Sequence, residues 1–246
     1  NIWTEQSERW LDMGVWDSQP PREDELAGKT CYAGLDLSST IDLTALVLDF
    51  PDSEGFHDVL AYFWMPEDRV NEKARQDRVP YDAWVRDGWI IATEGNVVDY
   101  DYIRAEITGI LADGRKRPEP CLVDRYYIKE LAKDRWNSTQ IGVQLVGDGI
   151  EVVDFGQGFA SMTAPAKELE RLLLDRKLRH GNHPVLRWMA ANVAVMQDPA
   201  GNLKPAKDKS TGRIDGIVAE CMALGSVIRH DQDGSIYERS DLLILG

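Results

Sequence analysis

The chain has 246 residues, of which 43% are hydrophobic and 28% charged, a composition that suits one large globular domain with a buried core. Its 42 acidic residues outnumber 28 basic ones, and the formal net charge of −14 predicts weak intrinsic affinity for nucleic acid. No apolar run has the length of a membrane span, and the three cysteines lack the CxxC spacing of zinc sites, so we expect neither a transmembrane helix nor bound zinc.

The first 28 residues differ in character from the rest of the chain. They lack the basic start and apolar stretch of a signal peptide, and Asn1 is not an initiator methionine, so we expect a fragment of a longer protein. We therefore predict a linker segment over residues 1–28, one domain over 29–230 and a flexible tail over 231–246.

Three strand-like runs follow one another closely at the start of the predicted domain. They cover residues 31–37, 43–50 and 57–64 and are rich in Val, Leu, Tyr and Phe. Connections this short favour an antiparallel meander, because parallel strands need long crossovers.

The remaining chain alternates between helical and strand-like patterns. A short buried strand is expected at 121–124, followed by a helix that contains Ile128, Leu131 and Ala132, and another strand at 150–155. A hairpin is expected from 193–197 and 202–205. The other predicted helices lie near 66–76, 81–88, 99–112, 138–146, 165–178, 183–192 and 214–228.

Three aspartates stand at the ends of these elements. Asp36 lies inside the first apolar run, Asp124 ends the run at 121–123, and Asp215 opens the last helical run. A carboxylate among apolar neighbours is costly unless something pairs with it, and acids that converge on a divalent cation would satisfy this need. Oxygen ligands of this kind suit Mg²⁺ or Mn²⁺.

Antiparallel strands, then parallel strands with helical crossovers and a closing helix, predict an α/β fold. This is the ribonuclease H-like arrangement, a mixed sheet of five or more strands with helices on both faces. In it the first acid lies on the first strand, the second at the end of the fourth strand and the third on the last helix.

The sequence also resembles the nuclease domain of the large terminase subunit of tailed bacteriophages, in the HK97-like group. The resemblance covers nearly the whole chain. The segments that carry it are Gly34-Leu-Asp-Leu-Ser-Ser-Thr40, Asp42-Leu-Thr-Ala-Leu46, Phe63-Trp-Met-Pro66, Asp154-Phe-Gly-Gln-Gly-Phe-Ala-Ser161, His180 to Asn192, and Lys209-Ser-Thr-Gly-Arg-Ile-Asp-Gly-Ile-Val-Ala219.

The resemblance implies a metal-dependent endonuclease that cuts concatemeric double-stranded viral DNA. It gives Asp36, Asp124 and Asp215 the catalytic, metal-binding roles, with two Mg²⁺ or Mn²⁺ ions. It also implies a missing N-terminal ATPase domain, a terminase small subunit and a portal protein as partners, and the cytoplasm of the infected host cell as the location. No Walker A motif occurs in this chain, so ATP hydrolysis is not expected of it.

Each of these assignments has a simpler alternative. Asp124 could cap the helix that follows it, and Asp215 could stabilise a helix N-terminus. Asp42 and Asp198 could be accessory ligands, although a strand start and a hairpin turn are the preferred interpretations. Structural roles are also preferred for His180 and His183. We predict that four basic residues before the last helix contact the DNA backbone, although an ordinary solvated loop is an equal alternative: Lys204, Lys207, Lys209 and Arg213.

Two other functions remain open from the sequence alone. The acidic total favours a docking module that binds the motor half or the portal and cuts only in the assembled complex. A Holliday-junction resolvase or an exonuclease on the same fold would differ in substrate, acting on branched DNA or ends.

Overall fold

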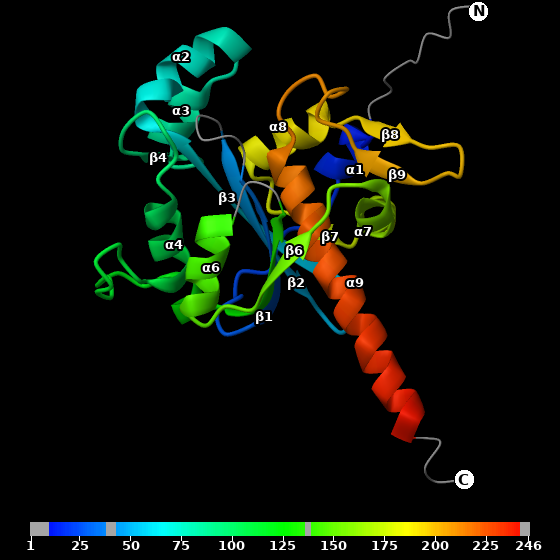
Figure 1. Cartoon of the computed structure of the whole chain (residues 1–246). Helices are drawn as coiled ribbons and strands as arrows, with labels where there is room; N and C mark the ends of the chain where they lie inside the picture. The colour runs from blue at the N-terminus through cyan, green and yellow to red at the C-terminus, as the bar shows by residue number, and fades with distance from the viewer. Residues whose placement is uncertain (1–9, 38–42, 136–138, 242–246) are drawn as a thin grey trace, which may run out of the picture.

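The computed structural model describes residues 10–37, 43–135 and 139–241, with side chains described as far as residue 231, Thr139 excepted. A mixed sheet forms the centre of the molecule, and helices cover both of its faces (Figure 1). Among the described residues, no helix combines the length and apolar character that a membrane crossing requires.

The central sheet has seven strands in the order β4-β3-β2-β1-β5-β6, with β7 added beside β3. Strands β1, β2 and β3 form an antiparallel meander, whereas β4, β5, β6 and β7 each pair in parallel with a neighbour. The strands are β1 Thr30–Asp36, β2 Thr44–Pro51, β3 His57–Pro66, β4 Ile91–Thr93, β5 Tyr127–Asp134, β6 Val152–Phe155 and β7 Leu178–Arg179, with a separate hairpin of β8 Val195–Gln197 and β9 Leu203–Pro205.

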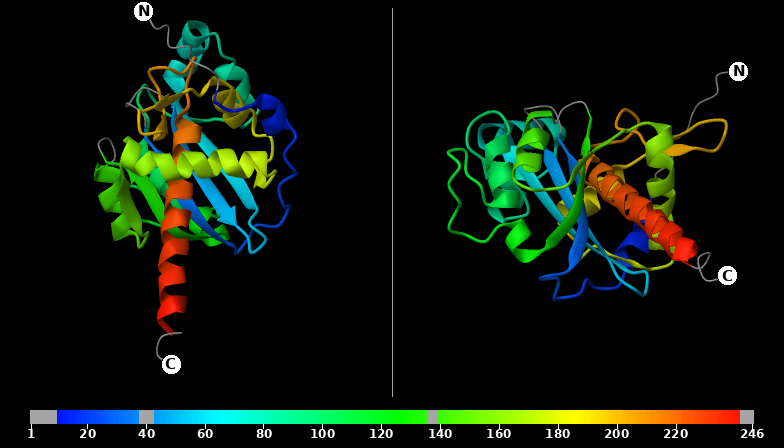
Figure 2. Two further views of the ribbon diagram at one scale, coloured as in Figure 1. Left: turned by 90° about the vertical axis from the view of Figure 1, so that its right-hand side faces the viewer. Right: turned by 60° about the horizontal axis from the view of Figure 1, so that its bottom comes forward.

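Helices make up the two outer layers. On one side of the sheet α4, α5 and α6 cover the apolar face, and on the other α1, α7, α8 and α9 do so (Figures 1 and 2). The helices are α1 Met13–Asp17, α2 Glu67–Asp77, α3 Tyr81–Arg86, α4 Tyr100–Thr108, α5 Leu122–Arg125, α6 Thr139–Gly147, α7 Phe159–Leu174, α8 Pro184–Asn192 and α9 Asp215–Asp241.

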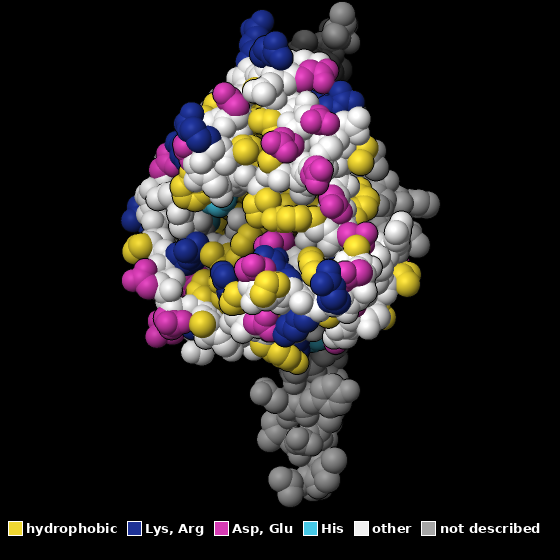
Figure 3. All heavy atoms as spheres, turned by 90° about the vertical axis from the view of Figure 1, so that its left-hand side faces the viewer, with side chains coloured by type: hydrophobic (Ala, Val, Ile, Leu, Met, Phe, Trp, Pro, Cys, Tyr) yellow, Lys and Arg dark blue, Asp and Glu magenta, His cyan; other side chains and the backbone are white. Residues whose placement is uncertain are grey.

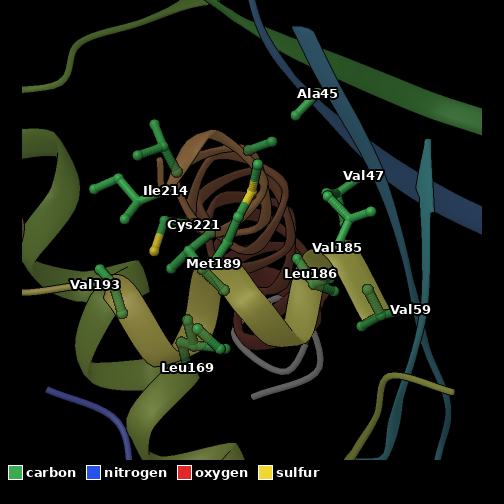
Figure 4. Packing of buried hydrophobic residues seen from close by; sticks show 14 of the residues in the cluster. Ala45, Val47, Val59, Leu169, Val185, Leu186, Met189, Val193, Ile214 and Cys221 are labelled. Atoms are coloured by element: carbon green, nitrogen blue, oxygen red, sulfur yellow. The ribbon is translucent and has the colours of Figure 1, made fainter. Parts of the chain in front are cut away.

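Alternation along β2 explains why the core has two halves. Ala45 and Val47 point to the face under α8 and α9, whereas Leu46 and Leu48 point to the face under α4 and α6. In Figure 4 the apolar side chains of α8 lie between α9 and the strands that carry Ala45, Val47 and Val59. Both faces of the central strands are therefore buried, which suits their continuous apolar sequences.

The ribonuclease H-like fold class and most predicted elements are confirmed. The three-strand meander and the hairpin lie where the patterns placed them, and the closing helix begins within one residue of its predicted start. The prediction for residues 121–134 is wrong, because Leu122–Arg125 is a short helix and Tyr127–Asp134 is a strand beside β1.

The ends of the domain also differ from the prediction. Leu11 and Trp16 are buried in the core, and His180 stacks on Trp16 with ring centroids 4.2 Å apart, so residue 28 does not mark the edge of the packed structure. Helix α9 continues to Asp241 instead of ending at 228, and it projects beyond the sheet (Figures 1 and 2).

A cluster of ionisable side chains lies in the core between α9 and the sheet. The carboxylate of Asp49 lies 2.7 Å from Nδ1 of His57, and both side chains are buried. Glu220 of α9 lies beside Asp49, and neither of its oxygens receives a hydrogen bond from the described residues. Burial, together with the charge of Asp49, raises the pKa of Glu220 well above its usual range, so a protonated Glu220 can donate to Asp49.

We expect Glu220→Gln to change how stability depends on pH. Folding raises the pKa of this carboxyl. Its contribution to the stability of the fold is complete at pH values below the pKa of the unfolded state, near 4.5, and is lost as the pH rises from there through the pKa of the folded state. Above pH 4.5 the free energy of unfolding of the wild type should therefore fall by up to about 1.4 kcal/mol per pH unit. The glutamine of Glu220→Gln keeps a hydrogen-bond donor and does not titrate, so the variant should not show this loss. His57 contributes in the same direction, because Asp49 outweighs burial and raises the pKa of His57 above 6.5.

Urea unfolding at pH 5, 6 and 7.5 measures this difference. The stability of Glu220→Gln relative to wild type should increase with pH, most clearly between pH 5 and 6, where His57 contributes little. The exposed Glu151→Gln serves as the control and should follow the wild type. Parallel curves for Glu220→Gln and wild type would show that Glu220 is ionised in the folded protein.

Candidate functional site

Asp36 and Asp215 meet at one end of the central sheet. Asp36 is the last residue of β1 and is 1% exposed, and Asp215 is the first residue of α9 and is 4% exposed. Nζ of Lys207 lies 2.7 Å from Oδ2 of Asp36 and 2.8 Å from Oδ1 of Asp215, so both carboxylates share one cation. The structure thus brings these two predicted site residues close together.

The close approach of β1 and α9 brings these acids together. Gly34 of β1 lies against the backbone of α9 at Ala219 and Ala223, and a Cβ on Gly34 would lie 1.9 Å from the carbonyl oxygen of Ala219. Only glycine allows a helix backbone to pack so closely on a strand. Gly34 precedes Asp36 by two residues and Ala219 follows Asp215 by four, so this contact fixes how near the two acids lie.

Electrostatics at the site favour a bound cation. Burial raises the pKa of Asp36 to about 6, Lys207 opposes this rise, and the neighbouring Asp215 adds to it. Gln157 donates a hydrogen bond to Oδ1 of Asp36 at 3.2 Å. For Lys207, burial disfavours the charge, but the charges of Asp36 and Asp215 outweigh it and raise the pKa of the ammonium group.

A third acid, Asp134, lies at the same end of the sheet. It is the last residue of β5, and the pairing of Leu35 with Lys133 places it beside Asp36 on the neighbouring strand. Asp36, Asp134 and Asp215 all line one cavity of about 690 Å³. Within the described part of the chain, no three acidic, histidine or cysteine side chains lie close enough together to enclose a metal ion as they stand.

Asp124 lies elsewhere, and its predicted position beside Asp36 is wrong. It precedes β5, whose first residue Tyr127 pairs with Thr30 at the opposite end of β1 from Asp36. Its carboxylate accepts the backbone N–H of Cys121 at 3.1 Å and pairs with Lys116 at 3.2 Å. These contacts hold the pKa of Asp124 at about 2, with Cys121 as the largest cause. Asp124 therefore helps to cap α5, the short helix in which it lies, whereas the simpler alternative expected it to cap a helix that follows it.

The four predicted basic residues divide into two pairs. Lys207 and Arg213 line the cavity, and Nε of Arg213 lies 3.5 Å from Oδ2 of Asp77, which also lines it. Lys204 lies instead over the ring of Phe159, 5.5 Å from its centroid, and Lys209 is not part of the cavity lining. Figure 3 shows basic and acidic side chains interspersed on the face that carries α2 and α4, so positive charge is not concentrated there.

Sequence reasoning missed Asp134, Gln157 and Arg78. Arg78 lines the cavity from the end of α2, where its backbone adopts a left-handed conformation with φ 56°. Gln157 lies in the Gly-Gln-Gly part of a motif that carried the family resemblance, and this polar residue between two glycines was the signal that could have identified it. Asp134 had no comparable signal, because the charged residues Glu130 and Lys133 conceal the strand that Asp134 ends.

Two of the other candidate residues, Asp198 and His180, make structural contacts. Asp198 makes the hairpin turn, because its carboxylate accepts the backbone N–H groups of Ala200 and Asn202, each at 2.9 Å. Nε2 of His180 lies 2.9 Å from the carbonyl oxygen of Trp16, which is a structural contact. Asp42 lies outside the described residues.

The ions implied by the family are consistent with the chemistry of this site. Asp36 and Asp215 offer oxygen ligands, the donors that Mg²⁺ and Mn²⁺ prefer, and they already hold a positive group between them. Asp134 adds a third carboxylate on the wall of the same cavity. Together, the order of the strands and the acids at the ends of β1 and β5 and at the start of α9 fit the ribonuclease H-like fold class.

Comparisons with known proteins identify the family. Residues 1–231 match the family "Terminase large subunit, endonuclease domain", and the chain belongs to this family. It is 42% identical over 197 residues to the "Terminase, large subunit" of Enterobacteria phage HK97, which covers 79% of this chain and 37% of that protein. It is 25% identical over 256 residues to "Protein YmfN" of Escherichia coli K12, covering 99% of this chain and 52% of that protein.

A solved structure agrees with this identification. The crystal structure of the HK97 bacteriophage large terminase superposes with a TM-score of 0.76 at 38% identity, covering 89% of this chain and 43% of that chain. The chain thus spans about half the length, or less, of the relatives that it matches.

Proposed function

We propose that this domain is a divalent metal-dependent endonuclease that cuts concatemeric double-stranded DNA during the packaging of a viral genome. The observation that carries the proposal is the meeting of Asp36 and Asp215 on one positive charge in a cavity that Asp134 also lines. Its membership of the terminase nuclease family supports the same conclusion.

Phosphodiester hydrolysis explains why acids are needed at this place. Two bound Mg²⁺ or Mn²⁺ ions would activate water and neutralise charge on the scissile phosphate and the leaving oxygen. Asp36, Asp134 and Asp215 would hold these ions, since all three line the same cavity. Gln157 orients the carboxylate of Asp36 through its hydrogen bond.

Substrate contacts would come from the basic groups around the cavity. Lys207, Arg213 and Arg78 line it, whereas Lys204 and Lys209 lie on the hairpin and loop that lead to it. Each would pair with a backbone phosphate and so position the strand without reading its sequence. The net charge of −14 predicts that the domain alone binds DNA weakly, so partners would supply much of the affinity.

These partners follow from the family. We propose that an ATPase domain, a terminase small subunit and a portal protein bring the DNA to this site in the cytoplasm of the infected bacterium. The expected linker at 1–28 would connect to that ATPase domain, with residues 10–28 packed on the nuclease fold as described above.

The test is cleavage of supercoiled plasmid by the chain in the presence of Mn²⁺. The wild type should nick or linearise the plasmid, EDTA should stop this, and Asp36→Asn should reduce the rate by about a thousandfold or more, because it removes the most deeply buried carboxylate of the site. Cutting that persists in Asp36→Asn would contradict the proposal. Circular DNA also separates this function from an exonuclease, which needs ends.

A further inference from the structure

Lys207 closes the acidic site from the solvent side. Its side chain is 44% exposed, whereas the side chains of Asp36 and Asp215 are 1% and 6% exposed. The side chain of Lys207 therefore reaches from the solvent-exposed surface to the two buried carboxylates. Two buried acids this close together need a positive partner, because like charges in a poorly solvated place repel strongly.

The backbone of Lys207 is fixed while its side chain has room to move. The neighbouring Ala206 is buried, and its N–H donates to the carbonyl oxygen of Ala194 at 2.9 Å. The carbonyl oxygen of Ala206 accepts hydrogen bonds from Lys209 and Ser210. A lysine side chain has a flexible four-carbon stem and a compact charge, so it can leave the carboxylates without any change in this loop.

Lys207 contacts the oxygens that a metal ion would need. Its nitrogen lies 2.7 Å from Oδ2 of Asp36 and 2.8 Å from Oδ1 of Asp215. A divalent cation bridging the same two carboxylates would meet this ammonium group at short range, with strong repulsion between the charges. The two positive groups therefore exclude each other.

We propose that Lys207 is a built-in counter-ion of the acidic site, one that a divalent cation must displace before it can bind. This inference rests on the proposed function, because it assumes that Asp36 and Asp215 are metal ligands. Lys207 is then a positioning residue: it keeps the two carboxylates together when no metal is present, and it sets the cation concentration at which the site fills.

Calorimetric titration of Mn²⁺ into the chain, without DNA, tests the proposal. Lys207→Met removes the competing charge and should bind Mn²⁺ at least about tenfold more tightly than wild type. This factor is expected when Lys207 leaves the carboxylates free for Mn²⁺ in about a tenth or less of the wild-type molecules. Lys204→Met is the matched control, since it removes a lysine from the same segment that lies over Phe159 and not over the acids. It should bind Mn²⁺ within about twofold of wild type.

Thermal unfolding supplies a second measurement. Without added cation Lys207→Met should unfold at a lower temperature than wild type, because its two acids have lost their partner, and Mn²⁺ should raise its unfolding temperature by more than that of wild type. Lys207→Gln keeps hydrogen-bond donors for both carboxylates and replaces Lys207→Met if the latter does not fold.

The outcomes separate this proposal from the proposed function. If Lys207→Met and Lys207→Gln bind Mn²⁺ no more tightly than wild type, Lys207 does not compete, although the nuclease proposal stands. If neither the wild type nor the variants bind Mn²⁺, both proposals fall. If the double variant with Lys207→Met and Asp36→Asn loses the tighter Mn²⁺ binding of Lys207→Met, both proposals are supported, and the bound ion is located at Asp36.

Discussion

Asp134→Asn should lower Mn²⁺-dependent plasmid cleavage by about a thousandfold, whereas Asp124→Asn should stay within a few-fold of wild type. Asp134 ends the strand next to β1 and lines the cavity that holds Asp36 and Asp215. Losing its negative charge removes an oxygen ligand from the proposed metal site. Asp124 lies at the other end of β1, so its carboxylate cannot reach the same ion.

The two variants control for each other. Both change a carboxylate to an amide on the same stretch of chain, and both keep the size of the side chain. Asp124→Asn keeps an oxygen that can accept the backbone N–H of Cys121, so it should unfold in urea close to wild type and keep its cleavage rate. The reverse pattern, with Asp124→Asn inactive and Asp134→Asn active, would contradict the geometry described above.

The misplaced second acid shows what the sequence could not reveal. Ile128, Leu131 and Ala132 have helical spacing, and Glu130 and Lys133 look like residues of a solvated helix face. In the fold both charged residues are buried on a central strand. Glu130 pairs with Arg229, and Lys133 pairs with Asp154, partners that lie far away in sequence. Because long-range pairs satisfy these charges, no local pattern marks the segment as a strand.

The correct predictions rested on short-range patterns. The meander follows from closely spaced runs of strand-forming residues, and Asp36 stands out because its neighbours are apolar. Asp215 stands out because it opens a long apolar helix. Tertiary contacts bring these two acids together. Lys207 pairs with both of them, although it is 171 residues from Asp36 and 8 residues from Asp215 in the sequence. The sequence suggested Lys207 as a DNA contact and gave no sign of its position between the acids.

Gly34→Ala should both destabilise the fold and disable the site. A Cβ on Gly34 would lie 1.9 Å from the carbonyl oxygen of Ala219 and 2.9 Å from the backbone nitrogen of Ala223, so no side-chain rotation can relieve the clash. Helix α9 must move away from β1, at a cost of about 1–3 kcal/mol or more. Since Asp215 begins this helix, its carboxylate moves with it, and a shift of about 1 Å can lower the rate about a hundredfold.

Urea unfolding and plasmid cleavage, measured on the same preparations, check this expectation. Gly147→Ala is the matched control: Gly147 ends α6, and an added Cβ there meets no atom within 4 Å. That variant should be within about 1 kcal/mol of wild type, on the stabilising side, and should cut at the normal rate. Cleavage by Gly34→Ala at the wild-type rate would mean that α9 can tolerate the extra carbon without moving Asp215. The contact at Gly34 would then not be what holds Asp36 and Asp215 at working distance.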